Sequence, residues 1–351
     1  MKNLGIKHPC KSAEACLPLL TAFFGVAVFV FAVVKASTSC FTHDESYSYL
    51  HFVHHSFMDI LSYKQWYTNN HLLNTLLMKY SGGLFGPTEF ALRLPNILLF
   101  GLYLGAAFRI LRRMDPWLRL AIFTLLITNV MLTDFFGLAR GYGLSIGFMM
   151  AGLYFFMKAQ GPRRGAFLTA FHLSFLLASL SSFTMLTVYA SLILTDNVIR
   201  AMAVDGAGDF FRGIPGFNKV HLIMLLLNSL VLYEPVRRVL THNAMDFGGK
   251  EGFFQDTVSF LIYHSFHNTF LPPRTDTFFQ VLFTATVLAG SAWILRAYSR
   301  RKEIPGASMR GLVISNLLLL SVSIIIVLQH YILGSDYPVA RFSLFLFPLF
   351  V

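Results

Sequence analysis

The chain has 351 residues, of which 55% are hydrophobic and only 13% are charged, and its mean hydropathy is +0.60. Soluble domains carry about 25% charged residues, so this composition excludes an ordinary soluble protein and predicts a chain that crosses a membrane several times. The net charge of +11 does not indicate a nucleic-acid partner, and we expect none, because Lys and Arg also gather in the cytoplasmic loops of membrane proteins.

Apolar runs of about 20 residues are long enough to cross a bilayer as helices. Runs of this kind predict nine spans, at 17–37, 90–112, 116–134, 140–157, 165–181, 183–200, 217–234, 277–298 and 311–333. A tenth run begins near Arg341 and is still apolar at Val351, so we expect this span to be truncated in the sequence given. The predicted fold class is an all-α integral membrane bundle of nine to ten spans, forming one domain over residues 1–351.

The distribution of basic residues predicts which loops face the cytoplasm. If the short segment 71–85 lies on the surface and does not cross, one set of loops holds about twice as many Lys and Arg as the other. The positive-inside rule then places that first set, with the N-terminus, in the cytoplasm. We expect 71–85 to be an interfacial helix within a first outer loop at 38–89. The helical spacing of apolar residues predicts a second such helix in the long outer loop, 234–276.

This topology brings distant ionisable residues to one outer face. They are Asp44, Glu45, His71, Glu89, Arg93, Asp134, Arg140 and Arg341. No motif was needed to produce this convergence, since it follows from the charge rule alone. Long outer loops are where substrate contacts are expected, so this face is the predicted functional site.

Several short motifs occur in a characteristic order along the chain. They are Asp44-Glu45 after the first span, His71-Leu72-Leu73-Asn74, the string Gly86-Pro87-Thr88-Glu89-Phe90-Ala91-Leu92-Arg93-Leu94-Pro95, Ala139-Arg140-Gly141-Tyr142, and Ala340-Arg341-Phe342 followed by Pro348. Together they resemble the polyprenyl-phosphate-dependent glycosyltransferases of the GT-C fold, which include protein O-mannosyltransferases and aminoarabinose transferases. The resemblance covers nearly the whole chain. It departs from the family at Leu72-Leu73, where two prolines are usual, and at Gly141, where proline is usual.

The resemblance implies a membrane glycosyltransferase that moves a sugar from a polyprenyl-phosphate donor to an acceptor hydroxyl. One carboxylate suffices as general base, because the lipid phosphate leaves as a stable anion. We expect Asp44 to be this base and Glu45 to orient it or to tune its pKa. Guanidinium groups suit the departing phosphate, and the candidates are Arg93, Arg140 and Arg341, with His71 and Lys64 as weaker ones. The supporting residues are Glu89, Asp134 and Tyr142.

The expected partners are the lipid-linked sugar donor, a glycan, lipid or protein acceptor, and membrane lipids. We expect a bacterial cytoplasmic (inner) membrane, with the active site on the outer face. The sequence shows no metal-ligand spacing, although a divalent metal requirement stays open.

Other interpretations of the same residues remain. Glu89 and Arg93 are spaced i, i+4 and could form an ion pair on one helix face. Arg140 and Arg341 could be ordinary interface anchors, and Asp134 is expected to cap a helix or to pair with Arg140. The rival functions are a transporter or flippase for a lipid-linked glycan, and a non-catalytic homologue. Transporters place ionisable residues in mid-span, whereas most spans predicted here have nearly charge-free centres.

Overall fold

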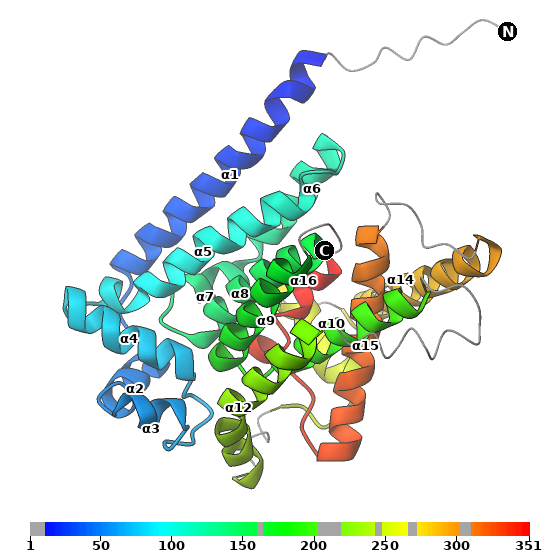
Figure 1. Cartoon of the computed structure of the whole chain (residues 1–351). Coiled ribbons are helices and arrows are strands. Elements are labelled where there is room, and N and C mark those ends of the chain that lie inside the picture. Colours follow the sequence, from blue (N-terminus) through cyan, green and yellow to red (C-terminus); the bar gives the residue numbers. More distant parts are fainter. Residues whose placement is uncertain (1–10, 160–163, 203–218, 243–247, 266–271, 302–309) are drawn as a thin grey trace, which may run out of the picture.

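The computed structural model describes residues 11–159, 164–202, 219–242, 248–265, 272–301 and 310–351 (Figure 1). Over these residues the backbone forms helices joined by turns and short loops. Their one β-type feature is an isolated antiparallel bridge between Gly249 and Tyr337. The all-α fold class predicted from the sequence is confirmed.

The helices follow one another along the chain with short connections. They are α1 Lys11–Thr38, α2 His43–His51, α3 Phe57–Leu61, α4 Leu72–Phe85, α5 Glu89–Leu111, α6 Pro116–Thr128, α7 Val130–Phe136, α8 Gly141–Lys158, α9 Arg164–Ser181, α10 Met185–Met202, α12 Lys219–Thr241, η1 Phe253–Val258 (a π-helix), α13 Ser259–Ser265, α14 Pro273–Arg301, α15 Arg310–Leu333, η2 Ala340–Phe342 (a 3₁₀ turn) and α16 Leu346–Phe350.

Six of the described helices are long and apolar enough to cross a membrane. They are Cys16–Thr38 of α1, α5, α9, α12, Pro273–Ala297 of α14 and Gly311–Leu333 of α15. The pair α6 and α7, bent by 64°, would add a seventh span. The sequence predicted nine, and the difference lies in α8 and α10, which have 18 residues each and are not among the six. Most residues of α8 are buried against other helices. A helix in this position exposes less apolar surface to lipid than an outer span does.

α8 lies inside the bundle against α5 and α9, and two of its glycines allow the close approach (Figure 1). A Cβ on Gly147 would lie 3.0 Å from the Leu99 carbonyl oxygen of α5, and one on Gly152 would lie 2.6 Å from the Phe175 ring of α9. The outer helices instead expose large apolar side chains such as Phe23 and Phe31 on α1. Exposed apolar surface on long helices is lipid-facing surface, so this is an integral membrane protein.

α4 has only 14 residues and is not among the helices able to cross, as the sequence predicted for 71–85. Its position in the membrane interface stays a prediction. In the long loop 234–276, where a second interfacial helix was expected, the structure has the two helical pieces η1 and α13, while 243–247 and 266–271 lie outside the described residues. That these pieces lie in the membrane interface stays a prediction.

A chain of buried polar side chains links α9, α10 and α12. His172 Nε2 lies 2.8 Å from His221 Nδ1, and His221 Nε2 lies 3.1 Å from Asp196 Oδ2. Asp196 is also paired with Arg164 at 3.2 Å and with Arg200 at 2.7 Å. His172, an ionisable residue that the charge count treats as neutral, lies in the centre of α9. We call these five residues the polar chain.

Candidate active site

The two acids of the first outer loop are fixed by the way α2 begins. Thr42 and Glu45 form a capping box, in which the Glu45 N–H donates to Thr42 Oγ1 and the Thr42 N–H donates to Glu45 Oε2 at 2.9 Å. This reciprocal cap orients the first turn of α2. The Glu45 side chain is completely buried, whereas the Asp44 side chain keeps 33% of its surface exposed.

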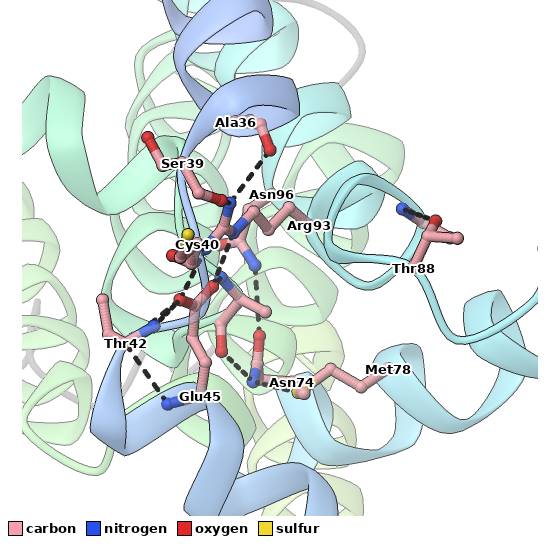
Figure 2. A network of polar contacts seen from close by, with 12 residues as sticks. Ala36, Ser39, Cys40, Thr42, Glu45, Asn74, Met78, Thr88, Arg93 and Asn96 are labelled. Atoms are coloured by element: carbon pink, nitrogen blue, oxygen red, sulfur yellow. Dashed lines mark hydrogen bonds and ion pairs between the residues drawn. The ribbon is translucent and has the colours of Figure 1, made fainter.

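Glu45 forms a bidentate ion pair with Arg93 of α5, through two hydrogen bonds of 2.8 Å (Figure 2). The remaining Arg93 donors go to the carbonyl oxygens of Ala36, Ser39 and Cys40 at the end of α1. All five N–H donors of Arg93 are thus in use. This disagrees with the role expected for Arg93, since a fully buried guanidinium without a free donor has nothing to offer a phosphate. Arg93 instead joins α1, α2 and α5.

The pKa of Glu45 reflects a competition between burial and hydrogen bonding. Burial is the strongest single influence and would raise the pKa, but the hydrogen bonds from Arg93, Thr42 and Ala139 together outweigh it. The pKa of Glu45 therefore lies below its usual value of 4.5, and the side chain is ionised at neutral pH. Held by Arg93 and by the Ala139 N–H at 2.7 Å, Glu45 is a structural acid with no lone pair directed at a substrate.

Asp44 lies between two arginines that come from distant parts of the chain. Its Oδ2 accepts a hydrogen bond of 2.9 Å from Arg341 of η2 and lies 3.2 Å from Arg140 Nη2 at the start of α8. The Tyr142 ring lies beneath both guanidinium groups, each 5.7 Å from its centroid. Arg140 is buried, but its Nη2 makes no hydrogen bond among the described residues. Two cations, one with an unused donor, therefore converge on one carboxylate oxygen.

Three asparagines that sequence reasoning did not single out as site residues support this arrangement. Asn69 donates to the Asp44 carbonyl oxygen at 3.1 Å and accepts a hydrogen bond from Arg140. Asn74 donates to the Ala139 carbonyl oxygen at 2.9 Å and accepts from Asn96 at 3.1 Å, as Figure 2 shows in part. Asn74 is part of the motif His71-Leu72-Leu73-Asn74, but the sequence analysis assigned it no role. Asn69 and Asn96 belong to no residue pattern that would have predicted their place in the site.

His71 is the residue before α4, and its ring packs edge-on against Tyr142 with 4.7 Å between centroids. Burial, and then the positive charge of Arg140, lower the pKa of His71 well below 6.5, and a hydrogen bond with the Ser181 backbone does not compensate. The ring is neutral at physiological pH, so His71 does not supply the positive charge expected of it. Its Nε2 is buried and has no partner among the described residues.

The remaining sequence candidates do not join the group around Asp44. Lys64 is exposed and pairs with Asp59 at 3.0 Å. Glu89 is exposed in the first turn of α5, and the expected ion pair with Arg93 is not formed, because Glu45 takes that guanidinium. Asp134 pairs with Lys35 of α1, so the pairing with Arg140 predicted from the sequence is wrong. Arg140 instead turns toward Asn69 and Asp44.

Residue 141 is glycine, where the family that the sequence resembles usually has proline, and the structure gives a reason for this difference. A Cβ at this position would lie 2.1 Å from the Ser181 carbonyl oxygen and 2.5 Å from His71 Cγ. Any side chain here, including proline, would push α8 away from α4 and α9. Gly141 thus allows Arg140 and Tyr142 to lie against His71.

A cavity of about 220 Å³ adjoins His71, whose ring packs against Tyr142. His71 and Phe342 form part of its wall, while Asp44, Arg140 and Arg341 do not line it. The rest of the wall comes from the α9–α10 connection, the ends of α12 and α15, and the segment 335–338. Among the described residues, no three His, Cys, Asp or Glu side chains are grouped so that they could hold a metal ion. A metal requirement stays a prediction.

Comparison with known proteins gives one informative match at the level of structure. No family model and no curated protein matches the sequence. The structure matches the crystal structure of ArnT from Cupriavidus metallidurans in the apo state, with a TM-score of 0.56, 12% identity and 94% of this chain covered. The chain has a GT-C fold. It spans 57% of the length of ArnT, and at this identity the likeness shows the GT-C fold alone.

Proposed function

We propose that this protein is a membrane glycosyltransferase that moves a sugar from a polyprenyl-phosphate donor to an acceptor hydroxyl at the outer face of the membrane. One observation carries the proposal: the partly exposed Asp44 carboxylate lies between the guanidinium groups of Arg140 and Arg341. A GT-C fold, which ArnT shares, is consistent with this chemistry. The proposed membrane is the bacterial cytoplasmic membrane, and the proposed acceptor is a glycan, a lipid or a protein.

In the proposed reaction the acceptor oxygen attacks the anomeric carbon while the bond from that carbon to the phosphate oxygen breaks. The bonding electrons leave with the lipid phosphate, and the acceptor proton moves to Asp44. A positioned base of this kind contributes about 10²–10⁴-fold to the rate. Arg140 and Arg341 stabilise the negative charge that develops on the phosphate, because planar guanidinium groups match phosphate oxygens.

Both proposed phosphate ligands are paired with the proposed base before any donor arrives. The donor phosphate must therefore displace Asp44 from Arg341, at a contact of 2.9 Å, and take up the unused donor of Arg140. This exchange releases the Asp44 carboxylate to accept a proton. Glu45 and Arg93 take no part in the exchange, and they fix the backbone on which Asp44 lies.

The test is transfer of radiolabelled sugar from polyprenyl-phosphate donors to cell-envelope acceptors by the purified protein. Asp44→Asn is expected to reduce transfer at least a hundredfold while donor binding survives. Asp59→Asn is the matched control, because Asp59 is an acid of the same outer loop that pairs with Lys64 away from the site. Undiminished transfer by Asp44→Asn would remove the proposed base, and absence of transfer in the wild type with every donor would favour a non-catalytic homologue.

The polar chain gives the rival transporter hypothesis one observation in its favour. Ionisable residues inside membrane spans often mark transport pathways, and His172 is fully buried in the centre of α9. The two hypotheses differ in a liposome assay with a fluorescent lipid-linked glycan. Glycan movement between leaflets that is lost in His172→Phe, without sugar transfer, would support a flippase. We favour the transferase because the polar chain is satisfied within the protein: Arg164 and Arg200 pair with Asp196, and the Tyr189 hydroxyl bonds with His172 Nδ1.

A further inference from the structure

We propose that the cavity walled in part by His71 and Phe342 is a subsite for one uncharged sugar ring, and that Ser179 and His71 are the hydrogen-bonding residues that recognise its hydroxyl groups. This inference rests on the proposed glycosyltransferase function. The cavity volume of about 220 Å³ is below the range of about 300–1,000 Å³ typical of sites for drug-sized ligands. It suits a single ring better than an oligosaccharide or a long prenyl chain.

Two residues of the cavity wall carry a buried polar atom that lacks a partner among the described residues. The atoms are His71 Nε2 and Ser179 Oγ, whose residues are 8% and 1% exposed. Leaving such atoms unpaired destabilises the folded protein, so native structures usually satisfy them with protein, water or a ligand. A hydrocarbon occupant would leave both unpaired, whereas a hydroxylated ring would satisfy both. Water can hold the same positions between turnovers.

The tautomer of His71 determines what its free nitrogen can do. The imidazole is neutral, and its other nitrogen is the one that meets the Ser181 backbone carbonyl, so that nitrogen carries the proton. Nε2 is therefore an acceptor, and it requires a donor such as a sugar hydroxyl. The phosphate of the donor is a diester that carries no proton at neutral pH, so it only accepts hydrogen bonds and is a poor partner for Nε2. This assigns His71 to sugar recognition rather than to the phosphate.

The other polar groups of the wall suit a ring with hydroxyl groups and apolar faces. Ser182 and Thr184 bond one another at 2.9 Å, and Thr187 donates to Gln329 at 3.0 Å. Leu186, Val236, Val239, Ile326 and Phe345 supply the apolar part of the same wall. Polar side chains of this wall can bond the hydroxyl groups of a sugar ring, and the apolar side chains can pack against its C–H faces.

Charge narrows the class of sugar further. Asp336 lines the cavity with its side chain 6% exposed, held by the Gly248 N–H at 3.1 Å, and no Lys or Arg lines it among the described residues. The backbone pairing of Gly249 with Tyr337, at 3.0 and 2.9 Å, fixes this part of the wall. Lys250, which is exposed and does not line the cavity, lies 4.0 Å from Asp336 and is already paired with it. A uronic acid or another anionic sugar would therefore face the Asp336 carboxylate with no Lys or Arg of the described wall to offset its charge. The subsite is thus expected to take neutral sugars and to reject acidic ones.

The first experiment measures kcat/KM for a neutral hexosyl polyprenyl phosphate and for its monodeoxy analogues. In Ser179→Ala we expect about a tenfold loss with the parent sugar, and near-equal rates for the parent and the one deoxy sugar whose hydroxyl meets Ser179. Ser174→Ala is the matched control, since Ser174 is a buried serine of the same helix that does not line the cavity. Equal discrimination among the deoxy sugars in wild type and Ser179→Ala would overturn the proposal.

The second experiment compares glucuronosyl and glucosyl donors. Wild type is expected to prefer the neutral donor, and Asp336→Asn to reduce that preference about tenfold.

A third measurement uses polyprenyl phosphate without a sugar as an inhibitor. It should inhibit wild type and Ser179→Ala equally. A tenfold weaker inhibition of Ser179→Ala would mean that the lipid fills the cavity, which would contradict the sugar subsite. If transfer depends on Asp44 but none of these preferences changes, the subsite is refuted and the proposed function stands. If no donor gives transfer, the proposed function fails first.

Discussion

At the scale of residues, two adjacent acids have different environments. Asp44 is partly exposed and shared by two arginines, while Glu45 is buried and bound on both oxygens. The motif Asp44-Glu45 predicted Asp44 as the base and Glu45 as its support, but it did not show that Glu45 is a buried acid paired with Arg93. The Thr42-x-x-Glu45 capping box was the available signal, because it predicts that the Glu45 side chain turns back toward its own helix start.

This division predicts unequal effects on stability for two conservative substitutions. Glu45→Gln leaves the Arg93 guanidinium buried without its counter-charge, so we expect a loss of about 3–5 kcal/mol in the free energy of unfolding. Asp44→Asn removes a partly exposed carboxylate and should change stability far less. Thermal unfolding of both variants in detergent checks this. An equal loss in the two would show that Glu45 has no special structural role.

The lowered pKa of Glu45 gives this contribution a defined pH dependence. A depressed carboxyl pKa adds stability that is complete above the unfolded-state value of 4.5 and is lost as the pH falls through the folded-state value. The stability difference between wild type and Glu45→Gln should be constant from about pH 8 to pH 5 and should shrink below about pH 4. Melting temperatures of the two proteins across this range measure it. A difference that shrinks as the pH rises would have the wrong sign.

At the scale of elements, the start of α8 determines whether the site can form. Arg140, Gly141 and Tyr142 all lie at this end, pressed against His71 and the carbonyl of Ser181. The spacing of apolar residues located α8 correctly in the sequence. It could not show that this helix is buried inside the bundle, because a buried helix and a lipid-facing helix have similar apolar patterns.

Gly141→Ala is expected to misplace Arg140. The new methyl group would overlap the Ser181 carbonyl oxygen, and overpacking of this kind costs about 1–3 kcal/mol. We expect lower thermal stability together with a loss of transfer activity per folded molecule. Gly83→Ala is the control, because a Cβ at this α4 position meets nothing within 4 Å, and a helical Gly→Ala change is neutral or stabilising. Normal activity in Gly141→Ala would show that the tight contact is dispensable.

At the scale of the whole molecule, the positive-inside rule and a few motifs were enough to group Asp44, Arg140 and Arg341, which are up to 297 positions apart in the chain. They were not enough to separate the residues that form the site from those that support it. Arg93 matched the family motif as well as Arg140 did, yet its five donors are used inside the protein. Hydrogen-bond saturation depends on backbone positions that sequence spacing does not reveal.

The polar chain also belongs to this scale, because it links three helices of the bundle. Asp196→Asn removes the carboxylate shared by Arg164, Arg200 and His221, and should cost about 3–5 kcal/mol. If the polar chain is structural, transfer per folded molecule is unchanged. Glu234→Gln, which removes the carboxylate of a surface ion pair on α12, should have a much smaller effect on stability. Stable Asp196→Asn protein with abolished transfer would instead place the polar chain in the mechanism.

The most direct test of the whole account is equilibrium binding of polyprenyl phosphate. Asp44→Asn is expected to bind more tightly than wild type, because the carboxylate that competes for the two guanidinium groups is gone. Arg341→Gln should bind about tenfold more weakly. Lys64→Gln should match wild type, since Lys64 pairs with Asp59 outside the site. Weaker binding by Asp44→Asn, or unchanged binding by Arg341→Gln, would contradict the claim that the arginines exchange Asp44 for the lipid phosphate.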